Sequence, residues 1–197
     1  MGTIIVAAVA IVVSYLIGTF PTALLVGRRS GFDPTAGGSG NPGATNAYRL
    51  GGRRAGAVVL VGDLVKGLGP TLAGLALAGR PLAAACGTAA VVGHVFPITR
   101  RFRGGKGVAT GAGMVLGLWP LAFPVAVALF VVVAAATRKV SLASFIAALV
   151  LPVAVALIGY PVSEIVVLVL LAVVVIVRHR DNLSRLVRGE EGSLGSG

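Results

Sequence analysis

The chain alternates long apolar runs with short polar or basic segments, and this pattern sets its fold class. A transmembrane helix needs about 20 mostly apolar residues, because the hydrocarbon core of a bilayer is about 30 Å thick. The apolar runs that are candidates for such helices cover residues 4–26, 55–78, 82–98, 108–136, 142–158 and 165–177. The pattern therefore predicts an all-α, polytopic integral membrane protein.

The run 108–136 has two interpretations, because its 29 residues allow one long tilted helix or two short ones. Trp119, Pro120 and Pro124 mark the point at which two helices would separate. With two helices the protein has seven spans, and 15 of its 17 Lys and Arg residues fall on one side of the membrane. Since Lys and Arg in short loops stay cytoplasmic, we expect seven transmembrane helices, an outer N-terminus and a cytoplasmic C-terminus.

The composition is typical of a membrane protein, and it argues against the nucleic-acid partner that the high positive net charge alone would suggest. Hydrophobic residues make up 56% of the 197 positions and charged residues 12%, about half of the roughly 25% usual in soluble domains. The net charge of +11 would suit a nucleic-acid-binding protein, but such a protein needs a broad polar surface. We therefore expect no nucleic-acid partner. No linker or repeat divides the chain, so residues 1–197 are predicted to form a single transmembrane domain.

The polar segment 31–54 is longer than a simple connection between two helices needs. Its glycines would let successive backbone N–H groups face one concavity, which would make an anion-binding nest. Arg49 can offer a planar, two-pronged donor to a phosphate. The other candidate ligands in this segment are Ser39, Asn41, Thr45 and Asn46. The alternative is a flexible polar loop whose arginines only set the membrane topology.

A second glycine-rich segment comes directly before the run at 108 and consists of Gly104, Gly105, Lys106 and Gly107. Backbone amides and a helix N-terminus attract anions, and Lys106 adds a full positive charge. The segment is not a nucleotide-binding P-loop, which needs glycine and Ser or Thr where this chain has Arg100 and Gly107. The alternative is a lysine that only sets topology.

Other polar residues are candidates for chemistry or for structural pairing. His179 and Asn182 lie three apart and share a face if the last helix continues past the membrane. Asn182 would orient a substrate oxygen, and His179 would donate to a phosphate or act as a base, since histidine titrates near neutrality. Asp63 and Lys66, three apart within a span, most simply neutralise each other, and we expect His94 to be structural. No group of His, Cys and carboxylates suggests a metal, so we expect neither a metal nor a cofactor.

Several segments together resemble the cytoplasmic motifs of the bacterial acyl-phosphate glycerol-3-phosphate acyltransferases, the PlsY family. They read SGNPGATNAYR, GHVFPITRRFRGGKGVAT, VSLAS and RHRDNLSRLVRGEE, and their order and spacing agree over nearly the whole chain. Recurring family segments are also similar to YLIGTFPTALLVGR and DLVKG, and the mild departures at Arg103 and Leu183 remove no expected ligand. The resemblance implies transfer of a fatty acyl group from acyl phosphate to the 1-hydroxyl of glycerol 3-phosphate. The products would be lysophosphatidic acid and phosphate, in bacterial phospholipid synthesis.

The resemblance also implies roles for individual residues. Catalytic contacts to the substrate phosphates are implied for Ser39, Arg49, Lys106 and His179. Further substrate-binding residues are implied at Asn41, Thr45, Asn46, Gly104, Gly105, Gly107, Asn182 and one serine of VSLAS, Ser141 or Ser144, with a preference for Ser144. The active site would lie on the cytoplasmic face of the bacterial inner membrane, and the acyl chain would lie among the apolar helices, in contact with membrane lipid.

This chemistry asks little of the protein beyond alignment and charge. Acyl phosphate is a mixed anhydride and is already activated, so the enzyme mainly has to align two anionic substrates and stabilise the developing oxyanion. The attacking hydroxyl must still lose a proton, and few carboxylates lie near the loops. We expect the phosphate of glycerol 3-phosphate to take the proton, with His179 as the alternative base.

Two other functions remain open at this point. Basic glycine-rich loops and broken helices also line the paths of transporters or channels for organic phosphates, although the spans here carry few polar groups. A membrane scaffold that binds anionic lipid would explain the arginines. It would not explain the polar side chains of Ser39, Asn41, Thr45 and Asn46.

Overall fold

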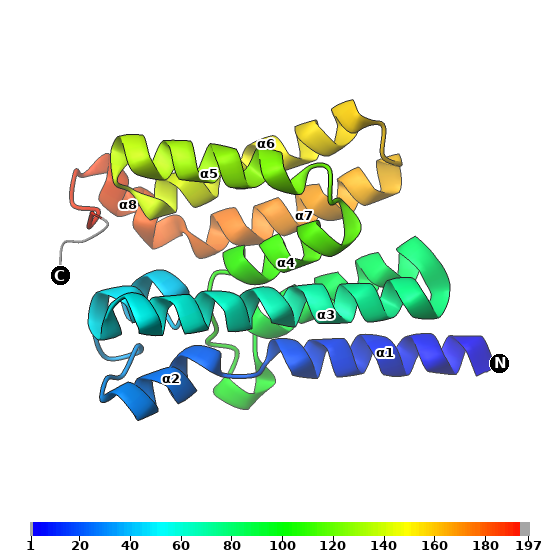
Figure 1. Cartoon of the computed structure of the whole chain (residues 1–197), viewed down its shortest axis with the longest axis horizontal. Coiled ribbons are helices and arrows are strands. Elements are labelled where there is room, and N and C mark those ends of the chain that lie inside the picture. The colour runs from blue at the N-terminus through cyan, green and yellow to red at the C-terminus, as the bar shows by residue number, and fades with distance from the viewer. Residues whose placement is uncertain (1, 194–197) are drawn as a thin grey trace. The chain divides into compact units, whose positions relative to one another are not determined.

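The computed structural model describes residues 2–193, and all regular structure in that range is helical. The helices are α1 (Gly2–Gly18), α2 (Thr22–Ser30), α3 (Ala44–Val95), α4 (Val108–Leu118), α5 (Phe123–Thr137), α6 (Val140–Ile158), α7 (Val162–Arg178) and α8 (Arg180–Val187), with a short 3-10 helix at Ile98–Arg100. The predicted all-α class is confirmed. The chain forms two compact units, one through Leu118 with α1 to α4 and one from Trp119 onward with α5 to α8 (Figure 1).

The first predicted span, 4–26, is two helices rather than one. Pro21 has no N–H with which to continue the helical hydrogen bonds, so the chain breaks between α1 and α2. At this break the ammonium group of Lys66 in α3 donates to the carbonyl oxygen of Phe20 at 2.9 Å. The run still makes one candidate span, Gly2–Ser30, as expected, but the helix within it is broken, and a side chain from another helix bonds to the break.

In the first unit α3 is the central element, and α1, α2 and α4 all pack against it (Figure 1). Its backbone angles leave the helical region at Gly52 and again at residues 78–79. A methyl group on Gly74 would lie 2.8 Å from the Leu82 carbonyl oxygen, so the stretches on either side of residues 78–79 run back along each other. The break predicted between the second and third spans is confirmed.

In the second unit α6 is central, because α5 and α7 pack against it and α8 contacts both α6 and α7. The break predicted near residue 120 is confirmed, since α4 and α5 are separate helices. Trp119 is fully buried at the start of this unit, and its indole N–H donates to Glu164 Oε2 of α7 at 2.7 Å. This bond satisfies a carboxylate that would be costly to leave alone in an apolar setting.

Within residues 2–193, three helical stretches are long and apolar enough to cross a membrane, namely Gly2–Ser30, Ala44–Arg100 and Val140–Ile158. The bent pair α7 and α8 makes a fourth if it is counted as one span, while α4 and α5 are apolar but shorter. Large apolar side chains are exposed along much of α1 and α7. Contiguous apolar surface of this kind marks a site of interaction with lipid or another apolar partner.

Candidate functional site

Asn46 holds together the loop between α2 and α3. Its side chain is 1% exposed, and its amide group donates to the carbonyl oxygens of Pro34 and Gly37 at 2.8 and 3.0 Å. Its Oδ1 accepts the backbone N–H of Ser39 at 2.9 Å. The loop is therefore an ordered structure built around one buried amide, unlike the simple polar loop that was the alternative.

The expectation of a backbone anion nest in this loop is wrong for three of its amides. The N–H groups of Ser39, Gly40 and Gly43 each donate to an acceptor within the loop or to the Asn46 side chain. An ordered loop satisfies its own backbone donors in this way. Binding of an anion here would therefore rely on side chains.

The candidate side chains of this loop lie at the start of α3 or just before it. Ser39 is exposed, whereas Asn41, Thr45 and Arg49 are partly buried. Thr45 and Arg49 are four residues apart in the first turns of α3, whose N-cap is Gly43, so they share one face of the helix. The structure thus places a hydroxyl beside a guanidinium at this end of α3.

The second glycine-rich segment folds back against the end of α3. The Gly104 N–H donates to the Val95 carbonyl at 3.2 Å, and the Gly105 N–H donates to the His94 carbonyl at 3.1 Å. The expectation that these amides face an anion is wrong for both of them. Their glycines serve a different purpose, because a methyl group at either position would overlap His94.

Lys106 lies between this anchor and the first turn of α4. Gly107 has a φ of 83°, in the left-handed region that favours glycine, and its carbonyl accepts the N–H of Gly111 at 2.7 Å. The half-buried Lys106 is consequently held between two fixed backbone positions.

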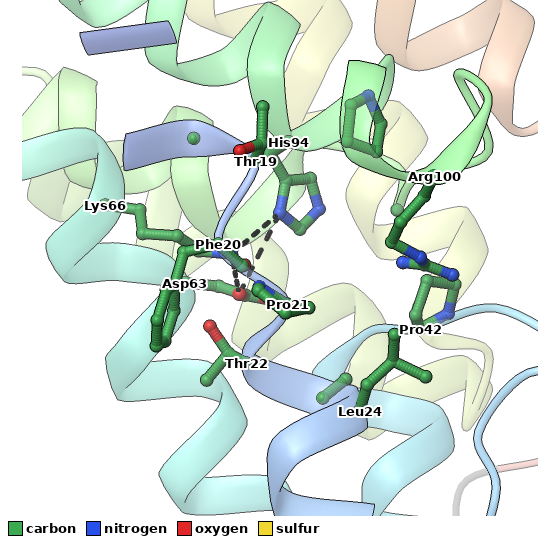
Figure 2. Close-up of a pocket in the computed structure, with 14 residues that line it drawn as sticks. Thr19, Phe20, Pro21, Thr22, Leu24, Pro42, Asp63, Lys66, His94 and Arg100 are labelled. Carbon is green, nitrogen blue, oxygen red and sulfur yellow. Dashed lines mark hydrogen bonds and ion pairs between the residues drawn. The ribbon is translucent and has the colours of Figure 1, made fainter. Parts of the chain in front are cut away.

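A small pocket that opens to solvent lies beside this segment (Figure 2). It is lined by the break between α1 and α2 and by polar side chains from α3 and the following loop. The polar and glycine residues of the lining include Thr19, Thr22, Asp63, Lys66, His94, Arg100 and Gly105.

Three of these residues form a buried ionic cluster. Lys66 Nζ lies 2.7 Å from Asp63 Oδ1, which confirms their expected pairing, and 3.4 Å from His94 Nδ1. His94 Nδ1 also lies 3.8 Å from Asp63 Oδ1. Sequence reasoning missed the link to His94, because that residue joins the pair only through the reversal at residues 78–79.

In the second unit, Glu191 gathers two of the predicted residues. Ser141 Oγ and Asn182 Nδ2 donate to Glu191 Oε1 at 2.7 and 2.6 Å, and Arg185 Nε donates to Oε2 at 2.9 Å. The ammonium group of Lys139 donates to the Glu191 backbone carbonyl. Sequence reasoning did not single out Glu191, because nothing in the local pattern separates it from the exposed Glu190.

The pKa values of two loop carboxylates follow from their donors. Burial would raise the pKa of Glu191, but the hydrogen bonds from Ser141, Asn182 and Arg185 outweigh it and hold the value below the usual 4.5. Two hydrogen bonds from Thr35 likewise lower the pKa of the exposed Asp33. Both groups are carboxylates at neutral pH.

His179 lies where α7 and α8 meet at a bend of 59°. The condition for a shared face, a last helix that continues straight past the membrane, is therefore not met. The His179 Nδ1 lies 2.8 Å from the Val175 carbonyl oxygen. Because a carbonyl only accepts, Nδ1 carries the proton, and Nε2 is the acceptor in the neutral ring. Ser144 lies on α6, and its Oγ donates to the Val140 carbonyl of its own helix at 2.9 Å.

The structure thus divides the predicted residues into two groups. The first unit carries Ser39, Asn41, Thr45, Asn46, Arg49, Gly104, Gly105, Lys106 and Gly107. The second unit carries Ser141, Ser144, His179 and Asn182.

Comparisons with known proteins agree with one another. The sequence profile of the glycerol-3-phosphate acyltransferase family matches residues 8–189. The chain is 47% identical to the glycerol-3-phosphate acyltransferase of Geobacter sulfurreducens over 91% of this chain and 93% of that protein, and 45% identical to that of Trichlorobacter lovleyi over 90% and 92%. Crystal structures of PlsY, an integral membrane glycerol 3-phosphate acyltransferase, match with TM-scores of 0.92 for the glycerol 3-phosphate form and 0.90 for the lysophosphatidic acid form. Each is 32% identical, and each match covers 96% of both chains.

Proposed function

Because the chain belongs to the glycerol-3-phosphate acyltransferase family, we propose that it transfers a fatty acyl group from acyl phosphate to the 1-hydroxyl of glycerol 3-phosphate. The products are lysophosphatidic acid and inorganic phosphate, and the reaction serves phospholipid synthesis. The observation that carries the proposal is 47% identity to a relative of that name over 91% of the chain. It favours this enzyme over a transporter of organic phosphates.

The two groups of residues supply different kinds of phosphate ligand. In the first unit, Arg49 and Lys106 bring positive charge to substrates that are anions at neutral pH, and charge-assisted hydrogen bonds to phosphate are the strong ones. Hydroxyl and amide groups from Ser39, Asn41 and Thr45 add neutral donors. In the second unit the proposed ligands are Ser144, His179 and Asn182.

Other predicted residues act in this proposal by shaping their surroundings. Asn46 holds the loop that carries Ser39, as its three hydrogen bonds indicate. Gly104, Gly105 and Gly107 give the segment around Lys106 a path that residues with side chains could not follow.

The reaction forms one bond and breaks one. The 1-hydroxyl oxygen of glycerol 3-phosphate attacks the carbonyl carbon of acyl phosphate, and the bond between that carbon and the phosphate oxygen breaks. The phosphate leaves with the electron pair, and the hydroxyl proton goes to a base. The cationic side chains favour the developing negative charge on the leaving phosphate.

The base is proposed to be the phosphate of glycerol 3-phosphate, with His179 as the alternative. The two histidines differ in this respect. His94 Nδ1 accepts from Lys66, so its neutral ring carries the proton on Nε2, whereas neutral His179 offers Nε2 as an acceptor. A His179→Ala variant that loses all turnover but keeps its affinity for glycerol 3-phosphate would favour the histidine base.

The hydrogen bonds of the two serines separate their roles. The Ser144 hydroxyl donates to a carbonyl of its own helix, and this proton can turn to a phosphate at little cost. The Ser141 hydroxyl donates to the buried carboxylate of Glu191, which would lose a charge-assisted bond if that hydroxyl turned away. We therefore assign substrate contact to Ser144 and a supporting role to Ser141.

The topology that we propose has seven spans. They are α1 with α2, the stretches 53–77 and 80–95 of α3, and then α4, α5, α6 and α7, with an outer N-terminus and the loops of the site on the cytoplasmic face of the inner membrane. A Cys86→Ala background allows single cysteines to be placed at Arg101 and Leu121, both exposed. An impermeant thiol reagent on intact cells should label position 121 only, and the reverse labelling would contradict the orientation.

The function is tested with the purified full chain, labelled glycerol 3-phosphate, and either palmitoyl phosphate or palmitoyl-CoA. We expect lysophosphatidic acid from the acyl phosphate. Arg49→Ala and Lys106→Ala should each lower kcat/KM by about 10- to 100-fold, because each removes a charge-assisted bond of about 1.5–3 kcal/mol. The matched controls Arg53→Ala and Arg103→Ala, at exposed positions near the same loops, should stay within about twofold.

Three outcomes of this experiment would overturn parts of the proposal. Product formed from palmitoyl-CoA but not from palmitoyl phosphate would contradict acyl phosphate as the acyl donor. Full activity in both the Arg49 and the Lys106 variants would contradict the phosphate ligands. No product from either donor, together with uptake of glycerol 3-phosphate into sealed vesicles, would replace the enzyme by a transporter.

A further inference from the structure

Lys66 links three parts of the first unit through the three protons of its ammonium group. The acceptors are Asp63 Oδ1, the Phe20 carbonyl oxygen at the break between α1 and α2, and His94 Nδ1 (Figure 2). An ammonium group has three donors and no acceptor, so this arrangement uses all three. Asp63, Lys66 and His94 are each less than a tenth exposed. The orientation of the His94 ring is consequently fixed from one side by a buried ion pair.

The opposite edge of the His94 ring lies against the glycine-rich segment. A methyl group on Gly105 would overlap His94 Nε2, so the backbone of Gly105 passes directly over that ring edge. The His94 carbonyl also accepts the Gly105 N–H at 3.1 Å. Both the side chain and the backbone of His94 therefore contact the residue that precedes Lys106.

We infer that Asp63, Lys66 and His94 are positioning residues for Lys106. The ion pair of Asp63 and Lys66 fixes the orientation of the His94 ring. The ring fixes the position of the Gly105 backbone, and Gly105 in turn fixes where the Lys106 backbone begins. The inference rests on the proposed function in one respect, which is that Lys106 binds a substrate phosphate. The path from His94 to Gly105 does not depend on that role.

A physical reason for such a device is the cost of ordering a long side chain. Holding a flexible, rotamer-rich side chain in one place on binding costs conformational entropy, and the cost is larger if its backbone must be ordered as well. A backbone that is fixed in advance lowers this cost. Loss of the device should therefore raise the KM for the phosphate substrate with little change in kcat.

The first experiment measures the segment itself in the purified full chain. His94→Asn keeps a side-chain oxygen that can accept from Lys66 but removes the ring edge at Gly105. We expect amide hydrogen exchange in a peptide covering residues 101–108 to rise about tenfold, with exchange over residues 82–92 unchanged. The double variant Asp63→Asn with Lys66→Met, which removes both buried charges together, should have the same effect on the segment.

The matched control is Glu164→Gln, a buried carboxylate that accepts from Trp119 in the other unit. The glutamine can still accept that bond, so exchange over residues 101–108 should stay as in the parent protein. It separates an effect of the His94 contact from a general loosening of the chain.

The second experiment is a double-mutant cycle on KM for glycerol 3-phosphate. Gly105→Ala alone should raise this KM about tenfold, because the added methyl group meets a ring that cannot move aside. In a His94→Asn background the methyl group enters vacated space, and the added effect should fall below threefold. Neighbours that touch show such non-additivity, whereas distant sites do not. Combined with Glu164→Gln, the Gly105→Ala effect should remain about tenfold.

Three results decide between the two ideas. Unchanged exchange over residues 101–108 in both His94→Asn and the Asp63, Lys66 double variant would overturn the positioning role. Additive effects of His94→Asn and Gly105→Ala on KM would overturn it as well. Raised exchange with unchanged KM values for both glycerol 3-phosphate and acyl phosphate would support the positioning role and contradict the assignment of Lys106 as a phosphate ligand.

Discussion

Each of the two units contains a buried carboxylate that gathers polar partners, Asp63 in the first and Glu191 in the second, and the two carboxylates do this in different ways. Asp63 is 2% exposed and pairs with a lysine that is also buried, three residues away on the same helix. Glu191 lies beyond α8 and accepts from a serine, an amide and the side chain of Arg185, which is 33% exposed. The first carboxylate neutralises a charge within the helices, whereas the second collects donors at a partly solvated edge.

The same contrast extends to the two histidines. His94 receives a proton donor on Nδ1, and His179 donates from Nδ1 to a carbonyl of α7. The two neutral rings therefore accept hydrogen bonds through different nitrogens, Nδ1 in His94 and Nε2 in His179. The hydrogen-bond partner, rather than the residue type, decides which of them is able to take a proton through Nε2.

The largest effect is expected from Asp63→Asn, which leaves the Lys66 charge buried without its counterion. Breaking a buried ion pair by removing one partner costs about 3–5 kcal/mol, so the thermal unfolding temperature in detergent should fall sharply. The double variant Asp63→Asn with Lys66→Met should recover most of this loss, because no uncompensated charge remains. If Asp63→Asn alone were as stable as the parent, Asp63 would not be needed to neutralise the buried charge of Lys66.

A smaller effect is expected from Glu191→Gln. The glutamine keeps one acceptor oxygen but turns an NH2 group toward a donor, so it loses about 1.5–3 kcal/mol of charge-assisted hydrogen bonding. Both stability in detergent and acyl transfer should fall, because Asn182 and Ser141 lose their common anchor.

The neighbouring Glu190 provides the matched control for this change. It pairs with Arg188, and both side chains are 59% exposed. An exposed pair of this kind contributes about 0–1 kcal/mol, so Glu190→Gln should leave stability and activity nearly unchanged. Equal losses of stability and activity in Glu190→Gln and Glu191→Gln would show that the Glu191 hydrogen bonds contribute no more than an exposed ion pair.

The smallest and most specific effect is the pH dependence of the Glu191 contribution. Its pKa is below 4.5 in the folded protein, so the unfolded chain binds the proton more readily, and the stabilisation is fully present above about pH 4.5. It is lost as the pH falls through the lower, folded value. The difference in unfolding temperature between the parent and Glu191→Gln should therefore be constant from pH 8 to 5 and shrink below 4.5. A difference that grows on acidification would contradict the direction of the shift.

The helices were largely predictable from the sequence, because apolar runs in a membrane protein have to match the thickness of the bilayer. The reversal at residues 78–79 and the separation of α4 from α5 follow from that rule together with the positions of basic residues. The break at Pro21 and the bend at His179 were missed. Both lie within or beside apolar segments, where hydrophobicity does not report a change of direction.

The candidate site was predictable in its residue types but not in its contacts. Glycine, serine and arginine in the two loops indicated phosphate chemistry, yet glycine amides that we expected to face an anion donate to protein carbonyls instead. Glu191 and the link between His94 and Lys66 were missed because they depend on partners far away in the sequence, 50 residues in the case of Ser141 and Glu191 and 28 in that of Lys66 and His94. Spacing alone carries no information about contacts that the tertiary fold creates.

The bond from Lys66 to the Phe20 carbonyl has a consequence for the evolution of this chain. The chain breaks there because of Pro21, and Lys66 is long enough to reach the carbonyl that the break turns toward α3. Replacement of the proline by a helix-forming residue would let α1 and α2 join and would remove one of the three acceptors of Lys66. Positions 21 and 66 are therefore expected to co-vary across homologues, with the requirement for lysine relaxed wherever the proline is absent.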